Sequence, residues 1–506
     1  MAESERDATR RFSPLDMDPE EFRSIGHQLV DRLADFFGSW PERGVTRGEF
    51  PAQIRSVVGT GPLPEEGSPA GPLVEEAARI LIDHSLFNGH PRFWGYITSS
   101  PAPIGALADL LAAATNANVG SFSLAPVATE IETQTVRWIG ELIGFPTDGG
   151  LLVSGGNMAN FVAFVAARRA KADWDLRAKG PGAGGPLRVY TSRETHTWIS
   201  KAADLFGLGT DAIRWIDTKA DLTMDTDALE ARICEDRGRG DQPFLVVGTA
   251  GSVSTGAIDP LATIAKICRE HAIWFHVDGA YGGFAAALPD APEELKALRE
   301  ADSIAVDPHK WLYAPLEAGC TLVKDRNVLV DAFSYRPPYY HFGGGEGPDS
   351  EEPTNFYELG PQNSRGFRAL KVWLGLRQVG RAGYVQMIGD DIRLARVLYD
   401  LLAAYPELER FTCTLSIVTF RFVPEGLALQ GQERETYLNT LNTELLDRLQ
   451  KGGEAYLSNA VIRDQYVLRA CIVNFRTQVA DLEALPELVM RIGGSVRAEM
   501  RAAADF

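Results

Sequence analysis

The sequence predicts an α/β fold with a mostly parallel, seven-stranded sheet covered by helices on both faces. Two observations support this prediction. From residue 151 onward, seven short β-rich runs alternate with segments of helical periodicity. The turn Asp148-Gly149-Gly150 separates this part from a preceding region, residues 74–146, whose pattern is helical. Strands separated by helices are typical of parallel sheets that are buried on both faces.

The predicted strands cover residues 151–154, 187–190, 212–216, 244–248, 273–277, 303–306 and 321–323. A long loop, residues 335–361, is rich in proline and glycine, and its length indicates a mobile functional loop. Beyond it we expect a helix over residues 363–405. Strands at 415–423 and 469–476 then predict a small C-terminal α+β unit.

The first predicted helix lies near the N-terminus and is amphipathic. Asp18 can cap it and Pro19 suits its first turn. Its apolar stripe repeats with helical spacing at Phe22, Ile25, Leu29, Leu33 and Phe36. The helix is separate from the rest of the chain, so we expect this stripe to pack on a partner subunit, with the parent chain as the alternative. A second helix start is predicted from the capping-box pattern of Thr129 and Glu132.

Composition excludes several classes of protein. The chain has 506 residues, 45% of them hydrophobic, and a formal net charge of −18, which argues against a nucleic-acid partner. No segment resembles a membrane span or a secretory signal. The five cysteines are scattered and indicate reduced thiols in a cytoplasmic protein. Cys268, His271 and His276 have metal-like spacing, but a helix and a strand separate them, so no metal is expected.

Four segments of the α/β unit carry polar residues at the ends of predicted strands. Ser154-Gly155-Gly156-Asn157 leads from a strand into a helix, where backbone N–H groups can hold a phosphate; the alternative is a plain structural turn. Asp278 ends an apolar strand, as a ligand-binding carboxylate or as a helix N-cap. Lys310, beside His309, follows another strand and could form a Schiff base or be a solvated charge. His196 precedes a helix.

Together these four segments provide what pyridoxal phosphate needs. A lysine holds the aldehyde as an imine, and an aspartate keeps the pyridine nitrogen protonated. A helix N-terminus holds the phosphate, and an imidazole can stack on the ring. The sequence therefore predicts pyridoxal 5'-phosphate as the cofactor.

The chain resembles the group II pyridoxal-phosphate-dependent decarboxylases, which include the aromatic-L-amino-acid, histidine and glutamate decarboxylases. The resemblance runs from the Phe22 helix to Thr477. Its most specific block is Asp307-Pro308-His309-Lys310-Trp311, followed by His276-Val277-Asp278. Further blocks begin at Thr249, His90 and Arg365.

The resemblance implies a fold-type-I homodimer of the pyridoxal-phosphate-dependent transferase class, with active sites at the subunit interface. It implies a helical arm and dimerisation segment over residues 1–90, a large cofactor-binding domain over 91–395, and a small C-terminal domain over 396–506. Lys310 would form the Schiff base, Asp278 would pair with the pyridine nitrogen, and His196 would stack on the ring. The other cofactor-binding residues implied are Gly156, Asn157, Ala280, Asp307 and His309.

Four places depart from the family pattern. One is Gly251-Ser252-Val253, where relatives commonly have Gly-Thr-Thr. Many relatives have asparagine where this chain has Asp307, which puts a phosphate hydrogen bond from that side chain in doubt. In the long loop, a tyrosine of the family returns a proton after carbon dioxide leaves. An ungapped alignment puts Phe356 at that place and Tyr357 beside it; we favour Tyr357. Residues 118–120 replace the apolar lid residues that aromatic-acid decarboxylases place in the neighbouring subunit's site.

The predicted function is decarboxylation of an L-amino acid, and an aromatic L-amino acid is the substrate that we expect. Trp94 and Tyr96 near the pocket support this choice, and an acidic or other polar amino acid is the alternative. If Phe356 holds the catalytic position, the expected reaction is instead oxidative decarboxylation and deamination to an aldehyde. The sequence does not identify the individual substrate or the pathway.

Overall fold

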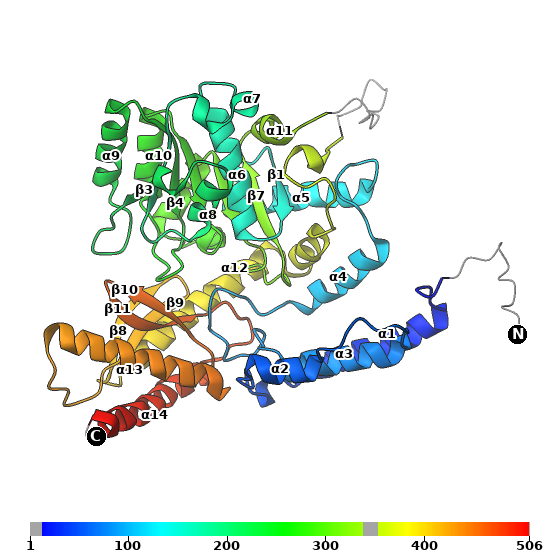
Figure 1. Cartoon of the computed structure of the whole chain (residues 1–506), viewed down its shortest axis with the longest axis vertical. Coiled ribbons are helices and arrows are strands. Elements are labelled where there is room, and N and C mark those ends of the chain that lie inside the picture. Colours follow the sequence, from blue (N-terminus) through cyan, green and yellow to red (C-terminus); the bar gives the residue numbers. More distant parts are fainter. Residues whose placement is uncertain (1–12, 337–352, 505–506) are drawn as a thin grey trace, which may run out of the picture.

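The computed structural model describes residues 13–336 and 353–504 of the chain. It comprises a large unit around a seven-stranded sheet, a small unit around a four-stranded sheet, and an N-terminal helical arm (Figure 1). Within these ranges, no helix is both long enough and apolar enough to cross a membrane.

The large sheet confirms the predicted fold class and all seven predicted strands. Its order is β1-β7-β6-β5-β4-β2-β3. Strands β2 to β6 pair in parallel wherever they are neighbours, whereas β7 runs antiparallel between β1 and β6. The strands are β1 (Gly149–Val153), β2 (Leu187–Ser192), β3 (Ile213–Ile216), β4 (Gln242–Thr249), β5 (Trp274–Asp278), β6 (Ser303–Val306) and β7 (Gly319–Val323).

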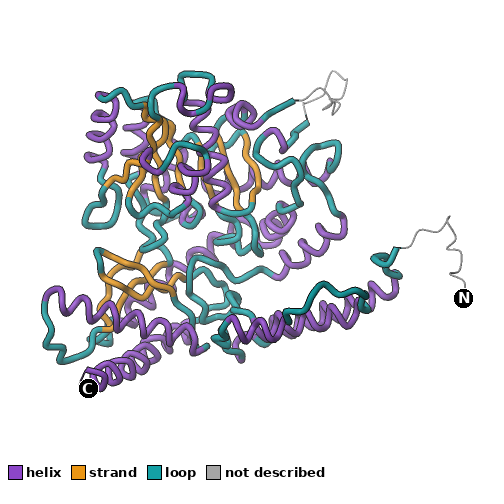
Figure 2. Tube along the Cα trace, in the orientation of Figure 1, coloured by secondary structure: helices purple, strands orange, loops and turns teal. Residues whose placement is uncertain are grey.

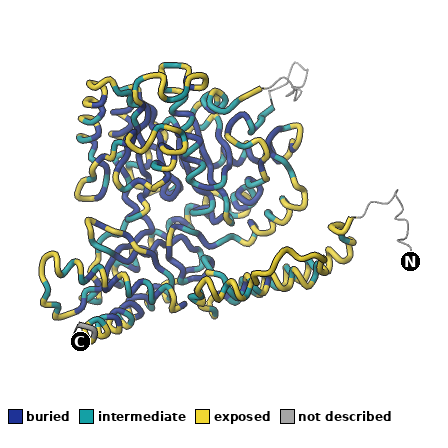
Figure 3. Tube along the Cα trace, in the orientation of Figure 1, coloured by how far each residue is buried: buried dark blue, intermediate teal, exposed yellow. Residues whose placement is uncertain are grey.

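Helices cover both faces of this sheet because successive strand residues point to opposite sides. In β4, Leu245 and Val247 pack with α6 (Gly156–Lys171) and α8 (Trp198–Leu205). Val246, between them, packs with α5 (Pro126–Ile143), α9 (Thr226–Gly238) and α10 (Leu261–Glu270) on the other face. The strands are consequently buried on both sides (Figures 2 and 3).

The small unit is antiparallel, with strand order β10-β11-β9-β8. Its strands are β8 (Leu408–Thr414), β9 (Ile417–Phe422), β10 (Ser458–Ile462) and β11 (Gln465–Cys471). The predicted strand at 415–423 is β9, and the one predicted at 469–476 overlaps the end of β11. The sheet packs with α12 (Ala369–Leu402), α13 (Gly431–Gly452) and α14 (Val479–Ala504). Helix α12 connects the two units, and Gly380, at φ +68°, breaks its helical geometry.

The arm consists of α1 (Pro19–Gly38), α2 (Pro51–Val58) and α3 (Ala70–His84), and it extends away from the two sheets (Figure 1). Helix α1 begins as predicted, with Asp18 accepting a hydrogen bond from the Glu20 amide. None of its residues is buried in this chain. At the base of the arm, Trp40 is buried, and the Arg476 guanidinium lies 4.2 Å from the centre of its ring.

The region between arm and sheet is less helical than predicted. Residues 74–146 contain most of α3, then α4 (Pro103–Thr115) and α5, but residues 85–102 form no regular helix. The capping box assigned to Thr129 and Glu132 is wrong, because α5 begins one turn earlier, at Pro126. Both residues lie inside the helix, and Glu132 instead forms a buried ion pair with Arg365.

Candidate active site

The candidate site is a cavity of about 330 Å³ at the carboxyl ends of the parallel strands. Open α/β sheets bind ligands at this edge because loops from several strands meet there. Eight site residues predicted from the sequence line this cavity: Gly156, Asn157, His196, Asp278, Ala280, Asp307, His309 and Lys310. Tyr357, the ninth, is not among its lining residues.

The first wall is the turn from β1 into α6. Gly155 has a φ of +112°, which residues with a side chain rarely adopt. A Cβ at Gly156 would approach Asp307 Oδ2 to 2.7 Å, so only glycine fits there without displacement. The backbone at the start of α6 is thus bare toward the cavity, as an anion-binding helix N-terminus requires.

Asp278 is the last residue of β5, and its carboxylate is held at both oxygens. Trp198 Nε1 donates to Oδ2 at 2.8 Å, and the Ala280 amide donates to Oδ1 at 3.2 Å. The next helical turn, Gly282–Ala287, has Tyr281 as its N-cap residue, so Asp278 is not the helix cap that its position also allowed. The two neutral donors fix an orientation that keeps Asp278 at the cavity wall.

Lys310 lies near the end of β6, in a turn with Asp307 and His309. Lys310 Nζ is 3.1 Å from Asp307 Oδ2, and the lysine side chain is only 16% exposed. It is therefore not a solvated surface charge. His309 Nδ1 accepts from the Ala318 amide at 3.1 Å, and burial lowers the pKa of His309.

His196 comes from the loop between β2 and α8. The Trp198 amide donates to its Nδ1 at 3.3 Å, which fixes the ring at the start of the helix. Burial lowers the pKa of His196, while Asp278 opposes that shift and Lys310 adds to it. The shift favours the neutral form of the ring, which can stack on a flat ligand.

A chain of buried hydrogen bonds lies beside the cavity, and the sequence analysis did not predict it. Asn160 donates to the Gly156 carbonyl at 2.9 Å, and its Oδ1 lies 2.7 Å from His276 Nε2. His276 Nδ1 is 2.8 Å from Ser303 Oγ. Spacing could have revealed both partners: Asn160 is one helical turn after Gly156, and His276 is two strand residues before Asp278.

The sequence also gave no sign of Arg469, on β11 of the small unit. Its guanidinium is buried and donates to Ser458 Oγ at 3.0 Å and to the carbonyl of Val253, a residue that lines the cavity. Burial lowers the pKa of Arg469. In the described part of the chain, no carboxylate forms an ion pair with Arg469.

The described end of the long loop lies against another segment of the chain. Phe356 is 1% exposed and packs in an apolar cluster, with the Arg365 guanidinium 4.6 Å from its ring centre. The Tyr357 amide donates to the Gly120 carbonyl at 3.0 Å. Arg365 also donates to the Val119 carbonyl at 2.9 Å, so residues 118–120 and the loop end form one body. Residues 337–352 of the predicted loop lie outside the described residues.

The lining residues fit pyridoxal phosphate. The bare start of α6 can hold a phosphate, Asp278 is oriented as a partner for a pyridine nitrogen, and Lys310 can bond to an aldehyde. The fit is imperfect at one place. Asp307 Oδ1 is buried and has no hydrogen-bond partner among the described residues.

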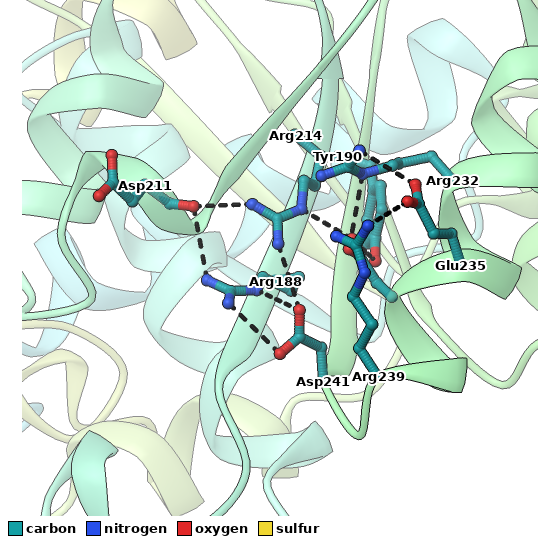
Figure 4. Close-up of polar contacts among 9 residues, drawn as sticks. Arg188, Tyr190, Asp211, Arg214, Arg232, Glu235, Arg239 and Asp241 are labelled. Carbon is teal, nitrogen blue, oxygen red and sulfur yellow. Dashed lines mark hydrogen bonds and ion pairs between the residues drawn. The ribbon is translucent and has the colours of Figure 1, made fainter.

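A second polar cluster lies at the opposite, amino edge of the same sheet (Figure 4). Asp236 Oδ2 accepts from Tyr190 Oη and Arg214 Nε, both at 2.8 Å. Asp241 Oδ2 accepts from Arg188 Nε at 2.8 Å and from Arg214 Nη2 at 3.2 Å. In this cluster, each of the two carboxylates has at least two cationic partners.

Comparison with known proteins places the whole chain in one family. The family model described as the pyridoxal-dependent decarboxylase conserved domain matches residues 59–423. An aromatic-L-amino-acid decarboxylase of Bacillus atrophaeus is 32% identical over 480 residues, which are 94% of this chain and 96% of that protein. A phenylacetaldehyde synthase of Petunia hybrida is 30% identical over 475 residues, 90% of this chain and 91% of that protein.

A solved structure is also similar to this chain over nearly its whole length. The Oryza sativa TDC with PLP and tryptamine has a TM-score of 0.87 and 27% identity, covering 96% of this chain and 99% of that one. The family match, the full-length relatives and the cavity together lead to one conclusion: this chain belongs to the pyridoxal-dependent decarboxylases and is a pyridoxal-phosphate-dependent amino-acid decarboxylase.

Proposed function

We propose that this enzyme converts an aromatic L-amino acid to its amine through Lys310, Asp278 and His196. The observation that carries the proposal is the convergence of these three side chains on one cavity beside the bare start of α6. Three strand ends supply the side chains and a fourth supplies the start of α6, so their meeting is a property of the fold rather than of one local motif.

Bound pyridoxal phosphate supplies an electron sink for the electron pair that remains when carbon dioxide leaves the substrate. Lys310 Nζ would hold the cofactor through its aldehyde carbon. Asp278 keeps a proton on the pyridine nitrogen, in the orientation set by Trp198. Neutral His196 packs on the ring, and the start of α6 binds the phosphate together with Asn157 and His309.

For the returning proton we propose Tyr357. Phe356 is enclosed in an apolar cluster, and moving it into a site would expose a buried aromatic ring. Tyr357 is partly exposed and carries a hydroxyl that can donate a proton. Because Tyr357 does not line the cavity of its own chain, we propose that it acts in the site of a second subunit.

The test of this role is the product formed by Tyr357→Phe. Without the donor, in aerated buffer, product should shift from amine toward aldehyde and ammonia, with dissolved dioxygen reduced to peroxide, and amine formation should fall about 100-fold. Tyr335→Phe, at the exposed start of the same loop, is the matched control and should keep amine as the product. An unchanged amine yield in Tyr357→Phe would refute the assignment.

Two further tyrosines of the loop, Tyr339 and Tyr340, extend this experiment. Each is replaced by phenylalanine separately, and amine and peroxide are measured as before. If only one of these variants diverts the product, the proton donor is that tyrosine and Tyr357 has a structural role. If wild type itself makes aldehyde with peroxide, the enzyme is an aldehyde synthase.

Support for an aromatic substrate comes from the relatives. Neither Trp94 nor Tyr96 is among the residues that line the cavity, and Trp94 is instead buried in the core of the small unit. Tyr96 is half exposed and its ring lies 6.0 Å from that of Tyr456. The Tyr96 amide donates to Ser458 Oγ, which also accepts from Arg469. Arg469, a buried cation next to the cavity, is our candidate for binding a substrate carboxylate. If that carboxylate belongs to the side chain, the substrate is an acidic amino acid.

A panel of L-amino acids distinguishes these substrates. Enzyme loaded with pyridoxal phosphate is mixed with each amino acid, and amine is identified by its mass. We expect the highest kcat/KM with an aromatic substrate, and Arg469→Met should raise KM more than it lowers kcat. Preference for aspartate or glutamate, lost in Arg469→Met, would replace the aromatic assignment.

We also propose that the enzyme is a homodimer with shared active sites. Helix α1 buries no residue in its own chain, and α4 exposes Leu107, Leu110 and Leu111. A second copy of the chain could cover these apolar faces, and its active site would then receive Tyr357 and residues 118–120 of the first copy.

Mixing Lys310→Ala and Tyr357→Phe chains tests the shared sites. The two chains are unfolded, mixed and refolded together. They should recover about a quarter of wild-type amine formation, because half of the dimers are hybrids and each hybrid contains one intact site. No recovery in hybrids of proven dimeric mass would contradict shared sites.

A cytoplasmic location fits this proposal. All five cysteines are free, and three of them are buried. Reduced thiols are typical of proteins in the cytoplasm.

A further inference from the structure

Asp307 is placed where a cofactor phosphate is expected to bind. It follows β6, is 2% exposed, and its Oδ2 lies 3.1 Å from Lys310 Nζ. His309 Nε2 is 3.6 Å from the same oxygen. The other oxygen, Oδ1, is buried without a hydrogen-bond partner among the described residues. A buried carboxylate oxygen is costly to leave unpaired, so this arrangement calls for a functional explanation.

The carboxylate also faces the start of α6. A Cβ built on Gly156 would lie 2.7 Å from Asp307 Oδ2 and 3.3 Å from Asp307 Cγ. The first turn of a helix carries partial positive charge and favours one nearby anion. Asp307 and a phosphate would therefore compete for the same favourable position.

Two effects follow for cofactor binding, and both weaken it. A phosphate monoester carries between one and two negative charges near pH 7, so an adjacent carboxylate repels it. Asp307 Oδ2 also lies 3.1 Å from Lys310 Nζ, and this contact must be broken before the amine can bond to an aldehyde. An asparagine at this position would remove the repulsion and weaken this contact, although it could still accept a hydrogen bond from Lys310.

We propose that Asp307 acts as the counter-ion of Lys310 and opposes the cofactor's phosphate, so that this enzyme holds pyridoxal phosphate loosely and exchanges it with the medium. The proposal rests on the proposed role of Lys310. It gives Asp307 a function opposite to that of a phosphate ligand: this side chain lowers the affinity for the cofactor.

The decisive variant is Asp307→Asn, studied in the full-length protein stripped of cofactor. Pyridoxal phosphate is titrated into it, and the dissociation constant is measured from the absorbance of the Schiff base. We expect the dissociation constant to fall about tenfold relative to wild type, with slower release of bound cofactor into excess buffer. The matched control is Asp302→Asn, at the other end of β6. Its side chain accepts from the Phe275 amide, a bond that an asparagine can keep, and its affinity should be unchanged.

Pyridoxal without the phosphate separates the two effects. It can bond to Lys310 but presents no anion to Asp307. The gain in affinity from Asp307→Asn should therefore be several-fold smaller for pyridoxal than for pyridoxal phosphate. An equal gain for both would overturn the opposition to the phosphate.

Unchanged or weaker binding of pyridoxal phosphate by Asp307→Asn would overturn the whole proposal, provided that wild type shows the Schiff-base absorbance. Lys310→Ala tests the underlying function separately, because an absorbance that persists there would refute the role of Lys310 instead. If Asp307→Asn does not fold, Asp307→Ala replaces it. It also removes the charge, and tighter binding is again the expected result.

Discussion

Both edges of the large sheet carry buried carboxylates, but the partners of these carboxylates differ between the two edges. At the amino edge, Asp236 and Asp241 each contact at least two guanidinium groups, and Tyr190 adds a hydroxyl donor (Figure 4). At the carboxyl edge, Asp278 has only neutral donors, and no guanidinium forms an ion pair with Asp307 in the described residues. One oxygen of Asp307 has no hydrogen-bond partner there; the same holds for Oδ1 of Asp236, but that oxygen lies 3.5 Å from the Arg232 guanidinium.

This difference separates a structural cluster from a binding site. A buried carboxylate that is paired with two guanidinium groups of its own chain has little charge left to offer a ligand. A site must instead leave some hydrogen-bonding capacity unused, which its ligand then completes. The same sheet therefore uses one edge for stability and the other for chemistry, and variants at the two edges should affect different measurements.

The largest expected effect is at the carboxyl edge. Lys310→Ala should lower amine formation by about 10⁴-fold, because the covalent attachment of the cofactor is lost. Borohydride should no longer fix the cofactor to the chain. Thermal unfolding should change little. Activity that persists in this variant would show that the cavity is not the site of reaction.

At the amino edge the expected effect is on stability. Asp236→Ala leaves the guanidinium of Arg214 without its closest carboxylate and should lower the free energy of unfolding by about 3 kcal/mol, measured with urea. The dissociation constant of pyridoxal phosphate should stay within about twofold of wild type. A large loss of cofactor affinity without loss of stability would break the division between the edges.

The same cluster predicts a dependence on pH. Although burial opposes the shift, hydrogen bonds from Arg214 and Tyr190 hold the pKa of Asp236 below its ordinary value of 3.8. The stabilisation is therefore complete above about pH 4 and is lost as the pH falls through the lower, folded-state pKa. Wild type should lose stability on acidification more steeply than Asp236→Asn, as urea unfolding at a series of acidic pH values can show.

A smaller effect is expected for Asp278→Asn. The amide can keep the bond from Trp198 but cannot hold a proton on the pyridine nitrogen, so kcat should fall by about 100-fold while the fold is unchanged. Restored activity with a cofactor analogue whose ring nitrogen is permanently charged would sharpen the assignment. Full activity of Asp278→Asn with the natural cofactor would exclude it.

The smallest effect is expected for an exposed pair near the carboxyl edge. Arg193 Nε lies 2.6 Å from Asp217 Oδ1, but both side chains are more than half exposed. Arg193→Gln should change the free energy of unfolding by less than about 0.5 kcal/mol and leave cofactor binding unaffected. A larger loss would mean that charge pairing alone, without burial, stabilises this sheet.

Local sequence patterns were sufficient for the strands and for eight residues that line the cavity. The strand-end positions of Gly156, Asp278 and Lys310 follow from apolar runs that stop at polar residues, and the chain folds these ends to one edge. Patterns of this kind act over a few residues, so they could be identified from the sequence alone.

Contacts between distant residues could not be predicted in this way. The bond from Trp198 to Asp278 spans 80 residues, and the pair of Glu132 with Arg365 spans 233. The second pair explains why the capping box at Thr129 and Glu132 was wrong: a carboxylate suited to a helix start is used inside the helix by a remote guanidinium. The role of Tyr357 stays a prediction because it depends on a second chain.

The apolar stripe of α1, which its own chain covers only in part, has a consequence for how the protein is made. Phe22 is 59% exposed, while Ile25, Leu29, Leu33 and Phe36 are half-buried. Helix α1 ends at Gly38, and 506 − 38 = 468 residues of the sequence follow it. At a synthesis rate of about 5–20 residues per second, these residues take roughly half a minute to a minute and a half to be made, and the stripe is incompletely covered during that time. If its partner is a second chain, that time extends until two finished chains meet. In that case a segment that is made early completes its packing late, and we expect chaperone capture to be concentrated on this helix.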